Sequence, residues 1–532
     1  MARVGARRGR RPGRTVSGAE PGRTAVRPLL ALGSGALLAG AYQPVDLPAL
    51  SIPAVAVFSA VAWSGTWRAG ALAGAAFGLG FLGPLLWWLS GSISPGAWLA
   101  LVAVQAGWFA LLGSAIATVR SLPGVAWWTA VLWTAVEVLR SAWPLGGLPW
   151  GRLGFSALDT VWQGWLQWGG VTITTFVLAL VGAATGRLVV SRGPRAAPLG
   201  VAGLVAAASM APATMAAKQP RTDDNARVAI VQGGVPGAGN RLVDYHREVT
   251  DNHARETLAL FARRDASGQP APDFVLWPEN ATAVDPVTDE RANRAIRETA
   301  RATGVPLLAG SVTDGPGADG ARNQGIVWSS SGAPGQRYTK RHLVPFGEYV
   351  PWRSLATRVS NRLIEIPRDM VAGTVGAPLD VAGIPVADAL CFDVAYDDVI
   401  APQVRRGASL VTVQTSNAMF LGTAQLEQQW DISRVRAIES GRAVVVASVN
   451  GVSGAIGPDG QVIARLATRG TASAVVEVPL ARTLTPAMRW GPWPGRGAVS
   501  LALLGLVGVL VRRLRSRGPL ASSATPGGSG AR

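Results

Sequence analysis

Long apolar runs dominate the first 217 residues of the chain and return once near its end. A helix that crosses a bilayer needs about 20 mostly apolar residues, and several segments approach that length. The eight predicted spans cover residues 28–45, 47–66, 69–90, 94–119, 122–139, 163–186, 197–217 and 497–511. The pattern therefore predicts an α-helical transmembrane bundle in which seven spans precede a long polar region and one follows it.

Within the polar region, short apolar runs alternate with stretches of helical periodicity. Helices are predicted near residues 241–264, 287–303 and 423–441, and the Gly-Pro-Asp-Gly sequence at 457–460 predicts the turn of a late hairpin. Strands are predicted at residues 226–232, 273–277, 306–312, 325–329, 386–392, 409–414, 443–449 and 474–478. Strands that alternate with helices are typical of an α/β fold.

The segment Trp352–Ile366 has the pattern of an amphipathic helix. Its apolar face carries Leu355, Val359, Leu363 and Ile366, and its arginines lie elsewhere. Two interpretations stay open for this segment. It is either a lid that lies on the bilayer surface or an ordinary surface helix packed on its own domain.

Charged residues make up 15% of the chain, whereas a typical soluble domain has about 25%, which argues against a simple soluble enzyme. The formal net charge is +18. Residues 1–217 hold 15 Lys and Arg against 4 Asp and Glu, residues 218–495 hold 29 against 28, and residues 496–532 hold 6 against 0. Because the excess lies among and beside the apolar spans, it indicates membrane topology, and no nucleic-acid partner is predicted.

Basic residues also alternate between the loops that join the predicted spans. Eight arginines precede Leu29, Arg68 follows the second span and Arg120 the fourth, whereas the loops after the first and third spans have none. Only the loop after the fifth span, with Arg140 and Arg152, is ambiguous. Because cytoplasmic loops are enriched in Lys and Arg, both termini are predicted in the cytoplasm and the polar region on the other side of the membrane.

These boundaries divide the chain into five parts. Residues 1–27 are expected to form a disordered basic cytoplasmic tail, since a signal peptide would not be followed directly by further spans. Residues 28–217 form the seven-span bundle, and residues 218–495 form the extracytoplasmic domain. Residues 496–512 form the eighth span, and residues 513–532 form a second disordered tail.

Three residues of the polar region carry candidate chemistry. Cys391 is the only cysteine, so no internal disulfide forms. It follows an apolar run, and a cysteine in such a run is more often an inert core residue than a nucleophile. Glu279 ends a strand after Trp277 and Pro278, which places it either at a catalytic strand end or in a solvent-exposed loop. Lys340 is one of two lysines among 50 basic residues, and it is either a required compact cation or a random surface lysine.

Together, Glu279, Lys340 and Cys391 resemble in order and placement the residues of the nitrilase, or carbon-nitrogen hydrolase, superfamily. More closely, the chain resembles the apolipoprotein N-acyltransferase family over residues 28–512. The motifs that carry the resemblance are Trp277-Pro278-Glu279, Lys340 with Leu343-Val344-Pro345-Phe346-Gly347-Glu348, Cys391-Phe392-Asp393, Ser416-Asn417, Arg434–Glu439, Asn450–Ser453, Glu137–Arg140 and Leu148-Pro149-Trp150. The resemblance implies a nitrilase-like αββα sandwich attached to the eight-span bundle.

The resemblance also implies a reaction. An acyl chain would pass from a membrane phospholipid, through a thioester on Cys391, to the α-amine of the N-terminal S-diacylglyceryl-cysteine of an apolipoprotein. Glu279 would act as general base and Lys340 as oxyanion stabiliser, since a thiol needs a proton acceptor and the tetrahedral intermediate needs a cation. The implied protein is a monomer in the bacterial cytoplasmic membrane, and no metal or organic cofactor is required.

Other residues are expected to support the site. Glu348 would position or pair with Lys340, or act as a structural anchor, and Asp393 and Asn417 would lie nearby. Several positions depart from the family pattern, because Asp393 stands where Glu is common, Phe420 where Trp is common, and Trp430 where His is common. These departures leave Glu279, Lys340 and Cys391 intact.

Glu137 and Arg140 lie one helical turn apart at the outer end of the fifth predicted span. Ionisable residues in a membrane span are functional candidates. Two interpretations stay open, because the pair either contacts a phospholipid head group or forms a structural ion pair.

Two other functions compete with acyl transfer. A membrane-tethered nitrilase-type amidase would use the same three residues, so only the predicted spans argue against it. A non-catalytic lipid- or lipoprotein-binding relative would keep the fold, and the intact Glu279, Lys340 and Cys391 argue against that function.

Overall fold

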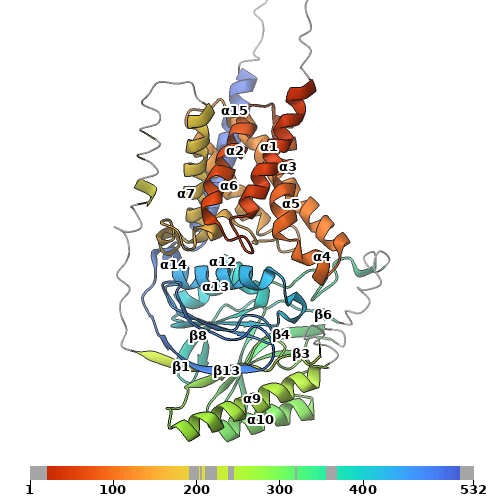
Figure 1. The fold of residues 1–532 in the computed structure, drawn as a ribbon, viewed down its shortest axis with the longest axis vertical. Helices are drawn as coiled ribbons and strands as arrows, with labels where there is room; N and C mark the ends of the chain where they lie inside the picture. Colours follow the sequence, from red (N-terminus) through yellow and green to blue (C-terminus); the bar gives the residue numbers. More distant parts are fainter. Residues whose placement is uncertain are drawn as a thin grey trace, which may run out of the picture.

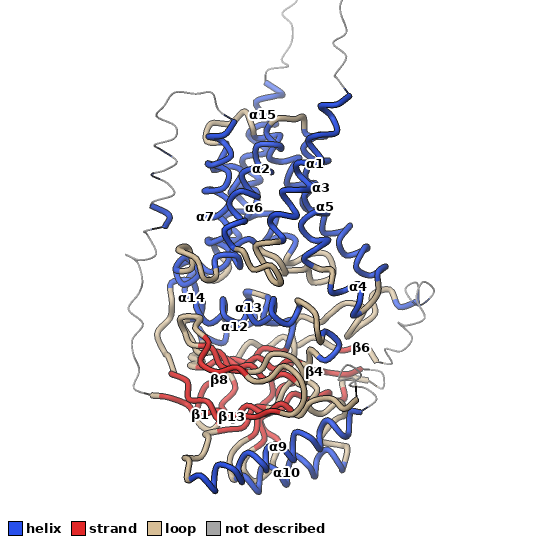
Figure 2. The backbone as a smooth tube through the Cα atoms, viewed as in Figure 1, coloured by secondary structure: helices blue, strands red, loops and turns tan. Residues whose placement is uncertain are grey.

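The computed structural model describes residues 21–190, 200, 203, 207–209, 224–237, 245–317, 320–354, 357 and 368–515. In this part of the chain, a helical bundle stands on an α/β domain (Figures 1 and 2). Both described ends of the chain lie at the end of the bundle that is remote from the α/β domain (Figure 1).

The bundle is built from apolar helices. They are α1 (Pro21–Ala39), α2 (Ser51–Trp63), α3 (Trp67–Leu85), α5 (Pro95–Val119), α6 (Val125–Arg140), α7 (Gly164–Val190) and α15 (Trp493–Arg515), with the short α4 (Trp88–Ser92) between α3 and α5. Among the described helices, four are long and apolar enough to cross a membrane, namely α3, α5, α7 and α15. The apolar segments at 26–39 and 48–63 are shorter.

The bundle differs in places from the sequence-based prediction. The predicted span at 197–217 lies almost entirely outside the described residues, as do residues 1–20 of the predicted tail. The prediction of a disordered tail is wrong for residues 21–27, because α1 begins at Pro21. Proline suits the first turn of a helix, where its missing N–H needs no partner.

Small residues let α3 and α5 pack closely. A Cβ at Gly74 would lie 1.9 Å from the carbonyl oxygen of Phe109, and one at Gly70 would lie 2.3 Å from that of Gly113. Glycines four residues apart on one helix face allow such close contact between helices in a membrane.

The α/β domain contains two packed sheets. The first has the order β13-β1-β2-β3-β4-β5, with β6 paired to β4, and the second has the order β12-β11-β10-β9-β8-β7. The strands of the first sheet are β1 (Asn225–Gln232), β2 (Phe274–Leu276), β3 (Leu307–Asp314), β4 (Gly320–Trp328), β5 (Pro334–Thr339), β6 (Asp369–Met370) and β13 (Ala472–Pro479). Those of the second are β7 (Leu379–Val381), β8 (Ile384–Leu390), β9 (Leu410–Thr415), β10 (Val444–Ser448), β11 (Gly454–Ile456) and β12 (Val462–Arg465).

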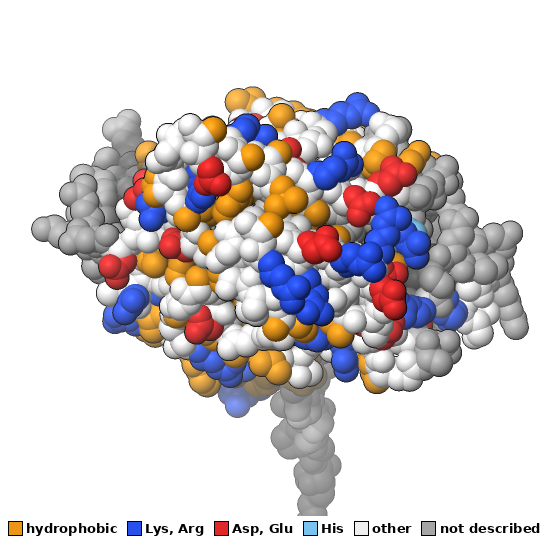
Figure 3. All heavy atoms as spheres, turned by 90° about the horizontal axis from the view of Figure 1, so that it is seen from below, with side chains coloured by type: hydrophobic (Ala, Val, Ile, Leu, Met, Phe, Trp, Pro, Cys, Tyr) orange, Lys and Arg blue, Asp and Glu red, His pale blue; other side chains and the backbone are white. Residues whose placement is uncertain are grey.

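Helices cover both outer faces of these sheets (Figures 1 and 2). Helices α9 (His246–Ser267) and α10 (Glu290–Thr303) lie on the face away from the bundle, where acidic and basic side chains are interspersed (Figure 3). Helices α12 (Asp397–Arg405) and α13 (Gln425–Ser440) lie between the second sheet and the bundle, and α14 (Pro486–Trp490) lies beside them. The predicted αββα sandwich is therefore confirmed.

The predicted strands all occur, although some of their boundaries differ. The hairpin at residues 457–460 is confirmed, because β11 and β12 pair antiparallel around it. Strand β4 begins at Gly320, before the predicted start at residue 325, because polar residues at its beginning hide its pattern. The amphipathic segment 352–366 lies mostly outside the described residues.

Gln428 of α13 connects the α/β domain to the bundle. Its Oε1 accepts hydrogen bonds from the indole N–H groups of Trp88 (3.1 Å) and Trp150 (2.7 Å). Its Nε2 donates to the backbone oxygens of Gln43 (2.8 Å) and Leu85 (3.1 Å). Both ends of one buried amide are thus bonded to groups of the bundle and its loops.

Replacing Gln428 with Leu should destabilise the protein by about 3 kcal/mol, because the buried indole N–H of Trp150 and the partly buried one of Trp88 lose their acceptor. The free energy of unfolding in mixed micelles measures this loss. Glu427→Ala is the matched control, since Glu427 is half-exposed and pairs with Arg465 at the surface, and it should cost less than about 1 kcal/mol. Equal losses for the two variants would contradict the anchoring role of Gln428.

Candidate active site

Cys391 lies where β8 ends and a short 3₁₀ turn, η5 (Cys391–Ala395), begins. Its backbone φ is +51°, in the left-handed region that non-glycine residues rarely adopt. The residue is partly buried. Strand β8 pairs parallel with β9, and the thiol lies at the carboxyl end of β8. Active sites of α/β proteins are commonly found at this end of parallel strands.

Lys340 follows β5 directly, and only 1% of the residue is exposed. Its Nζ lies 3.0 Å from Oε1 of Glu279 and 2.9 Å from Oε1 of Glu348. Burial alone would lower the pKa of Lys340, but the two carboxylates outweigh it and raise the pKa well above its usual value. Lys340 therefore remains a protonated ammonium.

Glu279 lies just beyond β2 and is almost fully buried. Its Oε2 accepts a hydrogen bond from the backbone N–H of Ser416 (2.9 Å), and its Oε1 accepts one from the amide of Asn323 (2.7 Å). Asn323 also donates to Oε1 of Glu348 (3.0 Å). These hydrogen bonds fix the orientations of the Glu279 and Glu348 carboxylates at the site.

Glu348 contacts the cluster and also holds a loop. Its Oε1 pairs with Lys340, while its Oε2 accepts from the backbone N–H of Val344 (2.8 Å). The structure therefore combines the two roles considered for Glu348, because one carboxylate pairs with the lysine and anchors the loop after it.

Asp393 ties the segment around Lys340 to the cysteine turn. Its carboxylate accepts hydrogen bonds from the Tyr338 hydroxyl (2.7 Å) and from the backbone N–H groups of Arg341 (3.2 Å) and His342 (2.8 Å). Since Asp393 lies within η5, these bonds set the distance between the thiol turn and the lysine strand. The short Asp side chain makes all of these contacts.

The surroundings of the thiol keep it protonated at rest. Burial first, and then the charge of Glu279, raise the pKa of Cys391 to about 12, although the ammonium of Lys340 lowers it. The amide of Gln429 also donates to Sγ at 3.9 Å. A neutral thiol beside a buried carboxylate needs a base at the moment of attack, because the thiolate is the nucleophile.

Aromatic side chains lie where the turn that begins at Cys391 meets the bundle. Phe392 stacks on Trp150, with ring centroids 6.3 Å apart, and Phe420 meets Trp88 edge to face at 5.2 Å. Trp88 and Trp150 belong to the bundle part of the chain. The thiol turn therefore lies at the boundary between the α/β domain and the bundle.

The remaining expected supporting residue, Asn417, is linked to the site only indirectly. Asn417 is buried, has a φ of +51°, and accepts from Gln425 (3.4 Å). Its neighbour Ser416 supplies the N–H that binds Glu279. The departure at Trp430 is also structural, since its buried ring packs beneath the guanidinium of Arg465.

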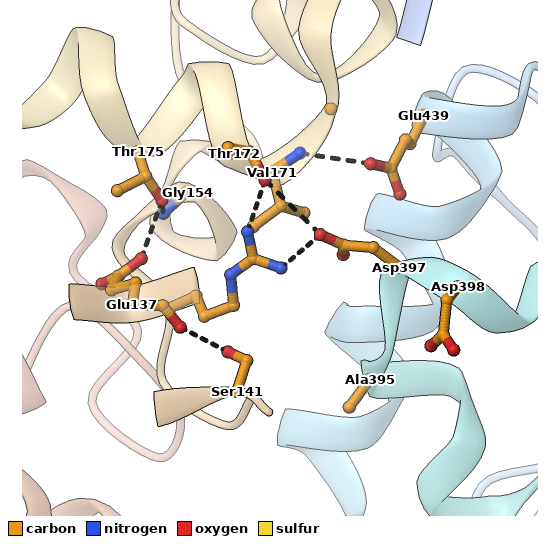
Figure 4. A network of polar contacts seen from close by, with 12 residues as sticks. Glu137, Ser141, Gly154, Val171, Thr172, Thr175, Ala395, Asp397, Asp398 and Glu439 are labelled. Atoms are coloured by element: carbon orange, nitrogen blue, oxygen red, sulfur yellow. Dashed lines mark hydrogen bonds and ion pairs between the residues drawn. The ribbon is translucent and has the colours of Figure 1, made fainter. Parts of the chain in front are cut away.

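Glu137 and Arg140 point inward and bind a loop (Figure 4 shows Glu137). Glu137 accepts hydrogen bonds from the Trp133 indole (3.0 Å), the Leu153 backbone (2.9 Å) and the Thr175 hydroxyl (2.9 Å). The guanidinium of Arg140 donates to the carbonyl oxygens of Leu148, Trp150 and Gly151.

These contacts correct both interpretations of Glu137 and Arg140. The two side chains are buried, which is incompatible with a contact to a lipid head group, and each binds the loop after α6 in place of the other. The physical reason is that backbone groups of this loop need partners inside the protein. Sequence spacing alone could not show a partner on the loop.

Asn323 is a site residue that the sequence analysis missed. It bridges Glu279 and Glu348 from β4, and a buried Asn-Gln pair inside a strand was the available signal. The signal was lost because the predicted strand began at Gly325. In the described part of the chain, no three His, Cys, Asp or Glu side chains form a group that could hold a metal ion, and an ammonium lies between the two site carboxylates.

Comparisons with known proteins match both parts of the chain. The family described as apolipoprotein N-acyltransferase N-terminal domain matches residues 34–184, and the carbon-nitrogen hydrolase family matches residues 227–485. The apolipoprotein N-acyltransferase of Mycolicibacterium smegmatis is 33% identical over 504 residues, which cover 90% of this chain and 84% of that protein. That of Pseudomonas putida is 29% identical, covering 88% of this chain and 93% of that protein.

Solved structures also match, with lower identity. An amidase from Nesterenkonia sp. is 18% identical with a TM-score of 0.36, and it covers 51% of this chain and 96% of that chain. The NitFhit protein of C. elegans is 19% identical with a TM-score of 0.34, and it covers 48% of this chain and 61% of that chain.

Glu279→Gln should lower the pKa of the Cys391 thiol below about 12, because it removes a negative charge that raises this pKa. Alkylation by iodoacetamide at about pH 9 should then become faster, since the thiolate fraction rises about tenfold for each unit by which the pKa falls. Cys391 is the only cysteine, so the label reports on it alone.

The same Glu279→Gln variant should lose acyl transfer, because it lacks the proton acceptor. The combination of a more reactive thiol and an inactive enzyme separates a base from a merely structural carboxylate. Glu427→Gln, on the surface of α13, is the control and should leave the alkylation profile unchanged. An alkylation pKa that stays the same or rises in Glu279→Gln would contradict the electrostatic coupling.

Proposed function

Because this chain belongs to the apolipoprotein N-acyltransferase family and is an acyltransferase of lipoprotein N-acylation, we propose that Cys391, Glu279 and Lys340 carry out its acyl transfer. One observation carries the assignment of these residues. A buried ammonium is held between two carboxylates beside the only thiol, at the boundary with an apolar helical bundle.

In the first half-reaction, the Cys391 sulfur attacks the ester carbonyl carbon of a phospholipid acyl chain. The thiol proton moves to the Glu279 carboxylate, and the oxyanion of the tetrahedral intermediate is stabilised by the Lys340 ammonium. The carbon–oxygen bond of the ester then breaks, and Glu279 returns the proton to the leaving alkoxide. The products are a lysophospholipid and an acyl-thioester on Cys391.

In the second half-reaction, the α-amine of the diacylglyceryl-cysteine of an apolipoprotein attacks the thioester carbonyl carbon. Glu279 accepts a proton from the attacking amine, and Lys340 again stabilises the oxyanion. The carbon–sulfur bond breaks, the amide forms, and the proton returns to the sulfur. The enzyme is thereby restored with a neutral thiol, the state that its raised pKa favours.

The location of the site supports lipid substrates. Trp88, Trp150, Phe392 and Phe420 form an aromatic contact between the bundle and the cysteine turn. A lipid ester and a diacylglyceryl group both stay in the bilayer, so a thiol at the edge of a membrane bundle can reach them without extracting either. An amidase for soluble amides has no need of this arrangement.

The topology completes the proposal. The bundle crosses the bacterial cytoplasmic membrane eight times, with both termini in the cytoplasm and residues 218–495 on the outer side. The alternation of arginines between loops supports this orientation. The proposal includes a monomer, since Glu279, Lys340 and Cys391 all come from one chain and the site needs no residue from a second copy.

Cys391→Ala should abolish both the acyl-thioester and N-acylation, because no other thiol is available in the chain. Incubation with a phospholipid that carries a labelled acyl chain, followed by electrophoresis with and without hydroxylamine, measures the adduct. Mass spectrometry of the lipoprotein N-terminus measures the transfer. Robust N-acylation by Cys391→Ala would rule out the covalent mechanism, and rapid hydrolysis of short amides without lipid would favour an amidase.

A further inference from the structure

An arginine from the bundle contacts the segment that carries the nucleophile. Arg152 lies in the loop between α6 and α7, and its side chain is 3% exposed. Its Nη1 lies 2.7 Å from Oδ2 of Asp397, and its Nη2 donates to the Thr172 hydroxyl at 2.8 Å. Figure 4 shows Asp397 and Thr172 facing each other across this contact. The guanidinium thus joins α7 to the first residue of α12.

Asp397 is shared between two arginines. Its other oxygen, Oδ1, lies 2.9 Å from Nη2 of Arg436 on α13. Burial acts to raise the pKa of Asp397, but Arg152 and Arg436 outweigh it and lower the pKa to about 2. The carboxylate is therefore ionised throughout the range in which the enzyme works, and it binds both guanidinium groups.

Arg436 in turn holds the turn that begins at Cys391. Its Nε donates to the carbonyl oxygen of Val394 (2.8 Å), and its Nη2 donates to that of Ala395 (2.6 Å). Both carbonyls belong to η5. Because Cys391 has a backbone φ of +51°, its conformation persists only where the surrounding structure holds the turn.

A second contact from the bundle holds Arg436 from the other side. Glu439 pairs with Nη1 of Arg436 and accepts a hydrogen bond from the backbone N–H of Val171 at 3.2 Å (Figure 4). Val171 follows a break in α7 at Gly170, where φ is +67°. A Cβ at Gly170 would lie 2.2 Å from Oε1 of Glu439, so glycine is required for this approach.

We propose that Arg152 is a positioning residue for Cys391, acting through Asp397 and Arg436 to set the thiol against the Glu279 and Lys340 pair. The bundle thereby fixes the location of the nucleophile relative to the lipids around it. Misplacing a reacting group by about 1 Å can cost about 100-fold in rate. Because these contacts link the nucleophile to the bundle, the nucleophile stays aligned with a substrate held in the bilayer.

The test compares Arg152→Gln with the parent enzyme in lipid nanodiscs. The kcat for acyl transfer should fall about 100-fold, with KM for the phospholipid within about threefold, because binding is retained and alignment is lost. The pKa of Cys391 from the pH dependence of alkylation should move from about 12 toward the usual value of about 8.5, as the turn shifts away from the groups that raise it. A purely structural role would lower the yield of folded protein but would move neither quantity.

A conservative variant supplies a rescue. Arg152→Lys keeps the charge opposite Asp397 but lacks the planar fork that also reaches Thr172, so its kcat should fall only about tenfold. Thr172→Val removes one acceptor and keeps the arginine, and its kcat should fall about threefold. If Arg152→Gln does not fold, these two variants decide the question, and parental kcat in both would overturn the positioning role.

The chain offers a matched control. Arg434 lies on α13, as Arg436 does, and makes two contacts of 2.8 Å with the carboxylate of Asp159. Asp159 lies in the α6–α7 loop, as Arg152 does, but Arg434 does not touch η5. Arg434→Gln should therefore leave kcat at the parental value. An equal loss in Arg434→Gln and Arg152→Gln would show that any ion pair across the boundary suffices, and the positioning role would be wrong.

The positioning role rests on the proposed function of Cys391, and Cys391→Ala separates the two. If Cys391→Ala retains acyl transfer, the proposed function itself fails. If Cys391→Ala is inactive while folded Arg152→Gln keeps the parental kcat and alkylation profile, only the positioning role fails.

Discussion

The ammonium of Lys340, held between Glu279 and Glu348, is the interaction on which the site depends. Burying one charge is costly, and burying three is tolerated only when they pair and their remaining hydrogen bonds are satisfied. Asn323, the Ser416 backbone and the Val344 backbone supply those bonds. The cluster thus carries a net negative charge beside the thiol, and this charge adds to burial, the larger effect, in keeping the thiol neutral until a substrate arrives.

The fold meets this requirement by bringing strand ends together. Glu279 follows β2, Lys340 follows β5, and Cys391 follows β8 of the opposite sheet. Asp393 then connects the two sheets, because it lies in the cysteine turn and accepts bonds from the lysine segment. Each sheet therefore contributes to the site, since Glu279 and Lys340 come from the first sheet and Cys391 comes from the second.

The contact between the α/β domain and the bundle has a polar part and an aromatic part. The polar part positions the two relative to each other, and the aromatic part lies beside the site. Gln428 uses both ends of its amide on groups of the bundle, and Arg152, Asp397, Arg436 and Glu439 form a compensated set of four charges. Trp88, Trp150 and Phe392 lie beside the thiol turn. This division places directional bonds where geometry matters and apolar surface where lipid chains would lie.

The sequence by itself determined the elements and the chemical groups. Apolar runs gave the bundle, alternating patterns gave the strands and helices, and the positions of Glu279, Lys340 and Cys391 at strand ends identified the candidate site. These features are local, because a helix or strand depends on the spacing of nearby residues. Only the tertiary structure decided the partners of Glu137, Arg140, Asn323 and Gln428, since Gln428 and Trp88 are 340 residues apart and their contact depends on how distant segments pack.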